Sequence, residues 1–242
     1  IRIHSIDGGG LRNAIPRESF SIITVSENDE ATLQNLIAKY LEVFQEEYES
    51  TDPDLQLILE PTENVNTLLS ESDQLNLLRS IYACPNGIYR MSPDIEGLVE
   101  ASNNIARVVV KDGNIKICCL TRSSVESTKI DLAMTLRSTF ELIGCKVTMS
   151  GDYPGWAPNM DSSILQLLRS LYESMYNEKP HVAACHAGLE CGILGTNYPE
   201  MEMISFGPNI KGAHSPDERA QISSVQKYWK FVLEILKQIP NK

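Results

Sequence analysis

Two histidines lie in glycine-containing loops, where they could bind a metal or a substrate. His186 begins the segment 186–192 directly after an apolar run, and His214 lies in the segment 212–218 after another such run. Ligands of α/β proteins bind beyond the carboxyl ends of strands, so both loops lie where a site is expected. A neutral imidazole can bind zinc, and the acidic pair that follows His214 could orient it. The alternative for His214 is a tight turn followed by a helix-start acidic pair, and His186 is the weaker candidate of the two.

Two other kinds of chemistry conflict with the local sequence. Cys185 precedes His186, but neighbouring residues of a strand point to opposite faces, so the two cannot form the thiolate–imidazole pair of a cysteine nucleophile. The glycine run 8–10 lacks the Lys-Ser/Thr ending of a phosphate loop and precedes a strand rather than a helix. We therefore interpret the thiol as buried and the glycine run as part of a hairpin.

Arg122 and Asn13 are the other candidate binding residues. Arg122 ends a run of Ile, Cys and Leu residues that is typical of a strand. Its guanidinium would then lie at the sheet margin, where two of its N–H groups could hold a carboxylate. The structural alternative is a solvated side chain or an ion pair with Glu126. Asn13 follows the glycine run and could simply be a turn residue.

Two periodicities predict the elements that position these residues. In residues 1–150, alternating apolar and polar residues predict antiparallel strands, and apolar residues spaced as on one helix face predict helices that cover one face of the sheet. Asp112-Gly113 predicts a type I′ hairpin turn, and Gly144 a helix end. The expected strands are 1–7, 18–25, 105–111 and 114–122, and the expected helices are 28–44, 72–82 and 129–143.

The segment 151–158 is too rich in glycine and proline for a helix or a central strand, and we place a domain boundary there. Beyond it the order is helix, strand, loop, strand, loop, helix, which is typical of an α/β domain. We therefore predict the α/β class: an antiparallel sheet with helices on one face, followed by an α/β segment. The expected strands of that segment are 181–185 and 201–206, with Asp161 or Ser162 capping its first helix and Ser223 or Ser224 its last.

The composition argues against several kinds of partner. The 242 residues carry 21 Lys and Arg against 32 Asp and Glu, a formal net charge of −11, which would repel nucleic-acid phosphates and anionic lipid headgroups. No stretch approaches the roughly 18 apolar residues that can span a bilayer. We therefore expect no nucleic-acid partner and no membrane partner. Six cysteines are too few for a disulfide scaffold, and we expect reduced thiols in a cytoplasmic protein.

Five segments together resemble one enzyme family. They are GGLRNAIPRE (9–18), PNG (85–87), YPGW (153–156), HAGLECG (186–192) and GAHSPDE (212–218), in this order along the chain. In them the chain resembles the bacterial aminoacyl-histidine dipeptidases, also called Xaa-His or cytosol non-specific dipeptidases, which are co-catalytic zinc peptidases. The resemblance corresponds to about the C-terminal half of such an enzyme. Because the chain begins inside a strand pattern with Ile1 rather than Met, we expect residues upstream of it.

This resemblance implies a role for each part of the chain. Residues 1–150 would form most of a lid domain that also mediates homodimerisation, and residues 151–242 would form the returning part of a catalytic domain that holds two metal ions. The family's remaining metal ligands and its general base would lie in the half that the resemblance does not cover. Four residues match site positions of the family: His214 as a metal ligand, and Asn13, Arg122 and Gly188 as substrate contacts.

The resemblance also implies an activity. We expect the complete enzyme to hydrolyse dipeptides, preferably those ending in histidine, with two metal ions, expected to be zinc, polarising the carbonyl and activating water. A catalytic zinc needs about three protein ligands, and this chain supplies one matching histidine. We therefore expect no catalytic residue in this chain, little or no bound metal, and no activity of the chain alone.

Two alternatives stay open. A non-catalytic, lid-like module for dimerisation or ligand binding would need no metal domain. An unrelated protein that binds small acidic ligands through Arg122 would leave the segment 212–218 unexplained.

Overall fold

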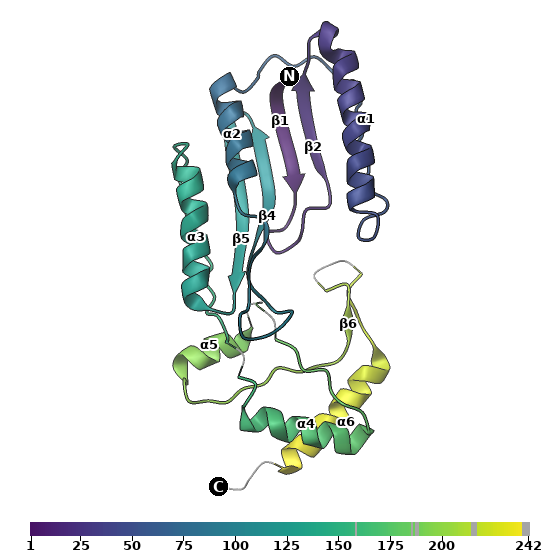
Figure 1. Ribbon diagram of the computed structural model, residues 1–242, viewed down its shortest axis with the longest axis vertical. Helices are drawn as coiled ribbons and strands as arrows, with labels where there is room; N and C mark the ends of the chain where they lie inside the picture. The colour runs from purple at the N-terminus through teal and green to yellow at the C-terminus, as the bar shows by residue number, and fades with distance from the viewer. Residues whose placement is uncertain (158, 185, 187–188, 214–216, 239–242) are drawn as a thin grey trace. The chain divides into compact units, whose positions relative to one another are not determined.

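The computed structural model describes residues 1–157, 159–184, 186, 189–213 and 217–238. Helices and antiparallel strands are mixed along the chain, which confirms the predicted α/β class (Figure 1). The chain forms two compact units: unit 1 is Ile1–Ala83 with Ile105–Cys119, and unit 2 is Cys84–Asn104 with Leu120–Lys242. The boundary expected near residue 150 lies within unit 2, and the division into lid and catalytic segment stays a prediction. Among the described helices, none has the length and apolar character that a membrane span requires.

One sheet of five strands contains the predicted hairpins. The strand order is β2-β1-β4-β3, and β5 also pairs with β4. β1 pairs antiparallel with β2 and with the second half of β4, whereas β3 pairs with the first half of β4. The sequence does not predict β3, because all five of its residues are exposed and show no alternation. The strands are β1 (Arg2–Gly9), β2 (Ser19–Thr24), β3 (Gly87–Met91), β4 (Val99–Lys111) and β5 (Asn114–Ser123).

The core of unit 1 joins this sheet to helix α2 (Glu71–Ala83). Leu77 of α2 is only 1% exposed and belongs to one cluster with Ile3 of β1 and Val110 of β4. The Leu69 backbone N–H donates to the Ile3 carbonyl at 2.8 Å, which fixes the entry to α2 against β1. The predicted helix 72–82 and strand 1–7 are thus confirmed, and they close an apolar core.

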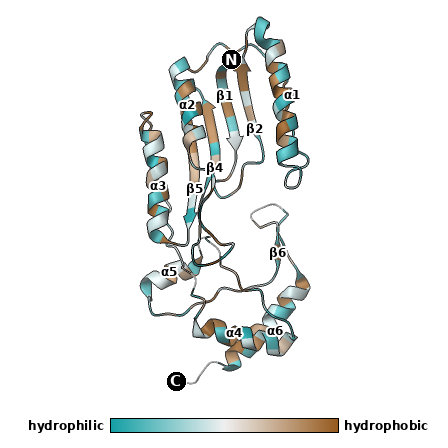
Figure 2. Cartoon of the chain, in the orientation of Figure 1, coloured by the Kyte–Doolittle hydropathy of each residue, from teal (hydrophilic) through white to brown (hydrophobic). Residues whose placement is uncertain are grey.

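Helix α1 (Glu30–Glu47) follows the short 3-10 helix η1 (Glu27–Asp29) and confirms the helix predicted over 28–44. Figure 2 shows apolar and polar residues alternating along it. Only Leu33 of its apolar stripe is buried, whereas Leu36 and Tyr40 remain exposed. The helix therefore covers less apolar surface than its sequence pattern predicts.

The hairpin between β4 and β5 and the helix after it form as predicted. Asp112 and Gly113 both have positive φ, 50° and 74°, as a type I′ turn requires. Helix α3 (Glu126–Glu141) then buries its apolar face, with Leu132 fully inaccessible to solvent. The position of Arg122 near the end of β5 is therefore fixed by a tight turn before it and a packed helix after it.

The last part of unit 2 is built on helices α4 (Ser163–Tyr176) and α6 (Ile222–Gln238). Phe231 of α6 lies edge-on to Tyr172 of α4, with ring centroids 5.5 Å apart. The Tyr176 hydroxyl donates to the Lys227 carbonyl at 3.0 Å, which ties the two helices together. Both predicted helices are confirmed, but α6 begins at Ile222, so neither Ser223 nor Ser224 is its cap.

The strands predicted over 181–185 and 201–206 are wrong for the described residues, which have no strand conformation there. A strand exists only where another strand satisfies its backbone N–H and C=O groups, and no described strand pairs with these segments. Helix α5 (Glu190–Asn197) begins inside the segment 186–192, for which the sequence predicts a loop. The remaining strands, β6 (Ile210–Lys211) and β7 (Arg219–Ala220), form a short ribbon.

Candidate functional site

The surroundings of Arg122 differ from those of an ordinary surface arginine. It is half-buried one residue before the end of β5. Among the described residues no carboxylate lies within ion-pair distance of its guanidinium. The alternative partner, Glu126, binds Lys129 instead, at 2.9 Å. A half-buried cation that has no carboxylate partner in the described part of the chain is suited to binding an anion, because it has already lost part of its hydration.

His186 lies on the same side of the sheet as Arg122. Its Nε2 atom is 2.7 Å from the Ser102 hydroxyl on β4. On the neighbouring positions of the two strands, the Thr121 hydroxyl donates to the Asn103 side-chain oxygen at 3.4 Å. Because adjacent residues of a strand point to opposite faces, Ser102 and Arg122 share the other face, and His186 is bound to that face.

The electrostatics of this group are unusual. Burial lowers the pKa of His186 from its ordinary value of 6.5, and the nearby positive charge of Arg122 lowers it further. The imidazole is therefore neutral at pH 7. Ser102 can bond to either tautomer, since a hydroxyl both donates and accepts. We call Arg122, His186 and Ser102 the Arg122 group. It presents a cation that no described carboxylate pairs with, a neutral imidazole and a hydroxyl, and such a group can bind a carboxylate.

Two glycines permit the close packing around the end of β5. A Cβ atom on Gly155 would lie 2.7 Å from the Ser124 carbonyl oxygen, and one on Gly192 would lie 2.5 Å from the Pro154 carbonyl oxygen. The segment 152–155 thus packs directly on the chain that follows Arg122, and α5 packs on that segment. These contacts hold α5, which begins four residues after His186, against the end of the strand that carries Arg122.

Lys129 anchors the same segment. Its ammonium donates to the Asp152 carboxylate and to the Tyr153 carbonyl, both at 2.7 Å. Burial disfavours the charged form of Lys129, but hydrogen bonds to Asp152 and Glu126 raise its pKa, so it stays charged. The same contact lowers the pKa of Asp152. The ion pair between Lys129 and Asp152 therefore holds the segment 152–155 against the end of β5 throughout the neutral pH range.

Asn13 lies in unit 1, in the turn between β1 and β2. Its side chain is exposed, and the Ala14 N–H donates to the Leu11 carbonyl at 3.1 Å across the turn. The base of the connection is fixed by Arg107, which donates to the Gly9 carbonyl at 2.8 Å. The structure thus presents Asn13 on a held, accessible turn, which suits a binding residue as well as a turn residue.

The other two predicted site residues, His214 and Gly188, lie outside the described residues. Among the residues that are described, no three His, Cys, Asp or Glu side chains gather as a metal site would require. The described part of the chain therefore does not fit a catalytic metal centre by itself.

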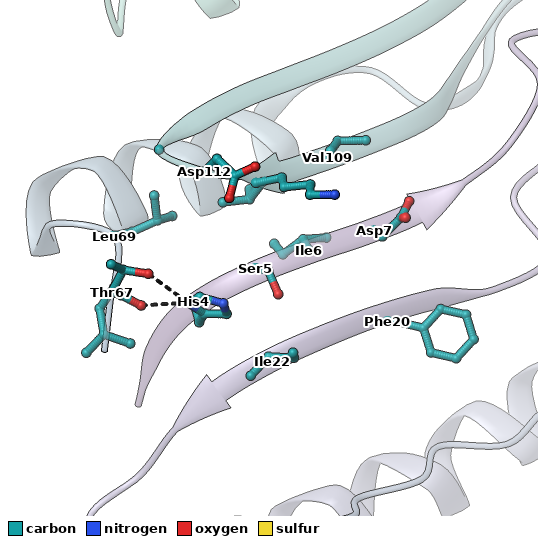
Figure 3. Close-up of a pocket in the computed structure, with 14 residues that line it drawn as sticks. His4, Ser5, Ile6, Asp7, Phe20, Ile22, Thr67, Leu69, Val109 and Asp112 are labelled. Carbon is teal, nitrogen blue, oxygen red and sulfur yellow. Dashed lines mark hydrogen bonds between the residues drawn. The ribbon is translucent and has the colours of Figure 1, made fainter. Parts of the chain in front are cut away.

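Two hollows lie apart from the Arg122 group. One, of about 370 Å³, lies in unit 1 beside β1 and β2, where His4 Nδ1 is 2.7 Å from the Thr67 carbonyl oxygen (Figure 3). The second, of about 640 Å³, lies in unit 2 and is lined by α4, α6 and the segments 180–184 and 203–207; we call it the α4–α6 cavity. Its walls are largely apolar, with Leu168 and Phe231 among them.

The binding role of Arg122 stays a prediction, and the sequence does not indicate that Ser102 and His186 lie beside it. Ser102 belongs to a polar stretch inside a strand, and His186 was the less favoured of the two loop histidines. Their contact joins residues 84 positions apart. The only local signal was a histidine directly after an apolar run.

Residues 21–238 match the Peptidase family M20/M25/M40. The match covers most of the chain, so the chain belongs to this peptidase family. This finding confirms the resemblance noted in the sequence.

Two individual proteins to which the chain is similar are both dipeptidases. The chain is 40% identical over its full 242 residues to the cytosol non-specific dipeptidase of Escherichia coli strain K12, and it covers 50% of that protein. It is similar in structure to the aminoacylhistidine dipeptidase of Vibrio alginolyticus, with a TM-score of 0.85 and 38% identity, over 100% of this chain and 49% of that one. The chain thus spans about half the length of the relatives that it matches.

Proposed function

We propose that this chain is part of a metal-dependent dipeptidase and that it supplies the group that holds the terminal carboxylate of the dipeptide. The observation that carries this proposal is the half-buried Arg122 without a carboxylate partner among the described residues. The family membership and the two dipeptidase relatives support the substrate class. The preferred substrates would be dipeptides with a C-terminal histidine.

Arg122 would bind and orient the substrate rather than take part in bond cleavage. Its planar guanidinium can donate two parallel hydrogen bonds to one carboxylate, which fixes both the position and the rotation of the dipeptide. An endopeptidase substrate lacks this carboxylate at the corresponding place, so the contact would also select short substrates. Asn13, in unit 1, and the backbone at Gly188 would be further substrate contacts, as the family resemblance implies.

The two parts of the chain would have separate tasks. Residues 1–150 would form most of a lid that also joins two copies into a homodimer, and residues 151–242 would belong to the catalytic domain. The α4–α6 cavity supports this assignment, because an open apolar cavity of about 640 Å³ can receive further elements of a larger domain. The chain's coverage of half of its relatives agrees with it.

His214 would be one ligand of a metal centre, expected to hold two zinc ions in the complete enzyme. Since a catalytic zinc needs about three protein ligands and this chain supplies one matching histidine, the chain alone would neither assemble that centre nor cleave a dipeptide. The complete enzyme would work in the cytoplasm. The printed name of the Escherichia coli relative, a cytosol non-specific dipeptidase, supports this location.

The test is a binding measurement on the 242-residue chain by isothermal titration calorimetry, with alanyl-histidine and its C-terminal amide as ligands. We expect the free acid to bind the wild type and Arg122→Gln to weaken it about tenfold or more, since hydrogen bonds to charged groups contribute about 1.5 to 3 kcal/mol. Arg137→Gln, which removes an exposed arginine of α3, is the matched control and should bind normally.

Equal affinity for the acid and the amide, or normal binding by Arg122→Gln, would refute the carboxylate role. Hydrolysis of alanyl-histidine by the chain alone in the presence of zinc would refute its inactivity. Sedimentation of the chain would test homodimerisation, which predicts a concentration-dependent doubling of mass.

A further inference from the structure

His186 has no role in the function proposed so far, although its place in the Arg122 group is specific. It is half-buried and lies 2.7 Å from the Ser102 hydroxyl. Because the Thr121–Asn103 contact marks one face of the sheet, Ser102 and Arg122 belong to the other face, beside His186. A second positive charge beside Arg122 would be repelled, so the neutral form of His186 is the one that fits these surroundings. A bound carboxylate reverses this condition, because it neutralises the charge of Arg122.

We propose that His186 is a positioning residue of the carboxylate site: it is neutral while Arg122 is free and takes up a proton from solvent when a carboxylate binds, so that affinity for the carboxylate rises as the pH falls. The inference rests on the proposed function, since it needs Arg122 to bind a carboxylate. His186 would then add a second positive charge and select a carboxylate over neutral ligands of the same shape.

Ser102 makes both forms of His186 compatible with one geometry. A serine hydroxyl can donate to an unprotonated ring nitrogen and can accept from a protonated one. The imidazole can therefore gain a proton at either nitrogen without losing its hydrogen bond to β4. Replacement of Ser102 by Ala would remove this support, whereas replacement by Thr would keep the hydroxyl.

Among the described residues, Arg122 is the charged group that changes the pKa of His186. From β5, Arg122 lowers the pKa of His186, after the effect of burial. From β4, the uncharged Ser102 hydroxyl lies 2.7 Å from its Nε2 atom. At the start of α5, Glu190 and Cys191 act on Tyr153, whose pKa burial and these two groups raise. A carboxylate on Arg122 is therefore the change that most directly alters the proton affinity of His186.

The direction of the pH effect follows from linkage. Binding that raises the pKa of His186 must itself strengthen as the pH falls through the two pKa values, because affinity and proton uptake are reciprocal. Couplings of this kind are typically fivefold or more, and partial exposure places this one at the low end. We therefore expect an increase in affinity of about fivefold.

The experiment uses the whole 242-residue chain and formate, a carboxylate that stays ionised at mildly acidic pH. The formate dissociation constant is measured by NMR from about pH 8 to about pH 5, together with the titration of the His186 ring, assigned by its loss in His186→Gln. In the wild type, formate should bind about fivefold more tightly at the acidic end and should raise the pKa of His186. His186→Gln should keep formate binding but lose this pH dependence, and Ser102→Thr should retain it.

His181→Gln, at an exposed histidine, is the matched control and should keep the wild-type pH dependence of formate binding. Formate binding of equal strength across the pH range would refute this inference alone and leave the carboxylate role of Arg122 intact. An absence of formate binding at every pH would refute the carboxylate role and the inference with it. Should His186→Gln fail to fold, the wild-type titration decides, because formate must raise the pKa of His186.

Discussion

Apolar residues are packed in a closed core in unit 1, whereas those of helices α4 and α6 in unit 2 lie beside a cavity. In unit 1, Leu77 and Val110 are each 1% exposed and meet in a closed core between α2 and the sheet. In unit 2, α4 and α6 have apolar faces of similar pattern, yet a cavity of about 640 Å³ lies against them. An amphipathic helix thus predicts which face turns inward, but the closure of that face depends on strands far away in the sequence.

The same contrast holds for polar groups. In unit 1, Asp7 pairs with Arg107 at 2.9 Å, and His4 is hydrogen-bonded to Thr67, so the groups satisfy one another. In unit 2, Arg122 is half-buried and has no carboxylate partner among the described residues. Polar groups that are paired internally stabilise a fold, whereas an unpaired one at a strand end marks a place for a ligand.

The largest effect should come from the two cores. Leu77→Ala should lower the free energy of unfolding by about 3 kcal/mol, because the removed side chain leaves a new void in a closed core. Leu168→Ala, in the wall of the α4–α6 cavity, should cost about half as much, because its surroundings already lack tight packing. Urea denaturation of both variants measures the difference, and equal costs would remove the distinction between the two regions.

A somewhat smaller effect should follow from adding one methyl group beside β5. Gly155→Ala should destabilise the chain by about 2 kcal/mol, because the new Cβ would collide with the Ser124 backbone. Gly207→Ala is the control, since no atom lies within 4 Å of its added Cβ. Thermal unfolding should separate the two variants clearly. A harmless Gly155→Ala would mean that the segment 152–155 does not pack tightly on the strand of Arg122.

His186 of unit 2 should cause part of the pH dependence of the free energy of unfolding. The folded-state pKa of His186 lies below 6.5, so the unfolded chain binds the proton more tightly, and the free energy of unfolding should fall as the pH drops below about that value. His186→Gln should remove this component, while His4→Gln in unit 1 serves as the comparison. Urea denaturation at several pH values would contradict the account if His186→Gln kept the full wild-type slope.

The smallest effect should come from the ion pair that anchors the segment 152–155. Asp152 is 82% exposed, so its pair with Lys129 should contribute less than about 1 kcal/mol. A double-mutant cycle with Lys129→Met and Asp152→Asn measures the coupling. Because Lys129 lowers the pKa of Asp152, this contribution should persist at neutral pH and be lost as the pH falls through that pKa. A coupling of several kcal/mol would show that the pair dominates the packing provided by Gly155.

The elements that depend on local pattern could be predicted from the sequence. Strand β1, helix α2 and the Asp112-Gly113 turn follow from residue spacing and turn chemistry, and the structure has all three. Arg122 was placed correctly near the end of β5, because a run of Ile, Cys and Leu residues leads into it.

The features that depend on distant partners could not be predicted. The apolar runs 181–185 and 201–206 have the composition of strands, but the described residues offer them no strand to pair with. The contact between Ser102 and His186 joins residues 84 positions apart, and no local pattern encodes it. Helix α5 contains two glycines, which weaken the helical pattern, and it forms where Gly192 can pack against the Pro154 carbonyl.

The most direct test of the central claim is a crystal structure of the chain with alanyl-histidine bound. We expect both carboxylate oxygens of the dipeptide to lie within hydrogen-bond distance of the Arg122 guanidinium, with the His186 ring on the same face of the sheet. A dipeptide whose carboxylate binds elsewhere, with Arg122 paired to a protein carboxylate, would contradict it.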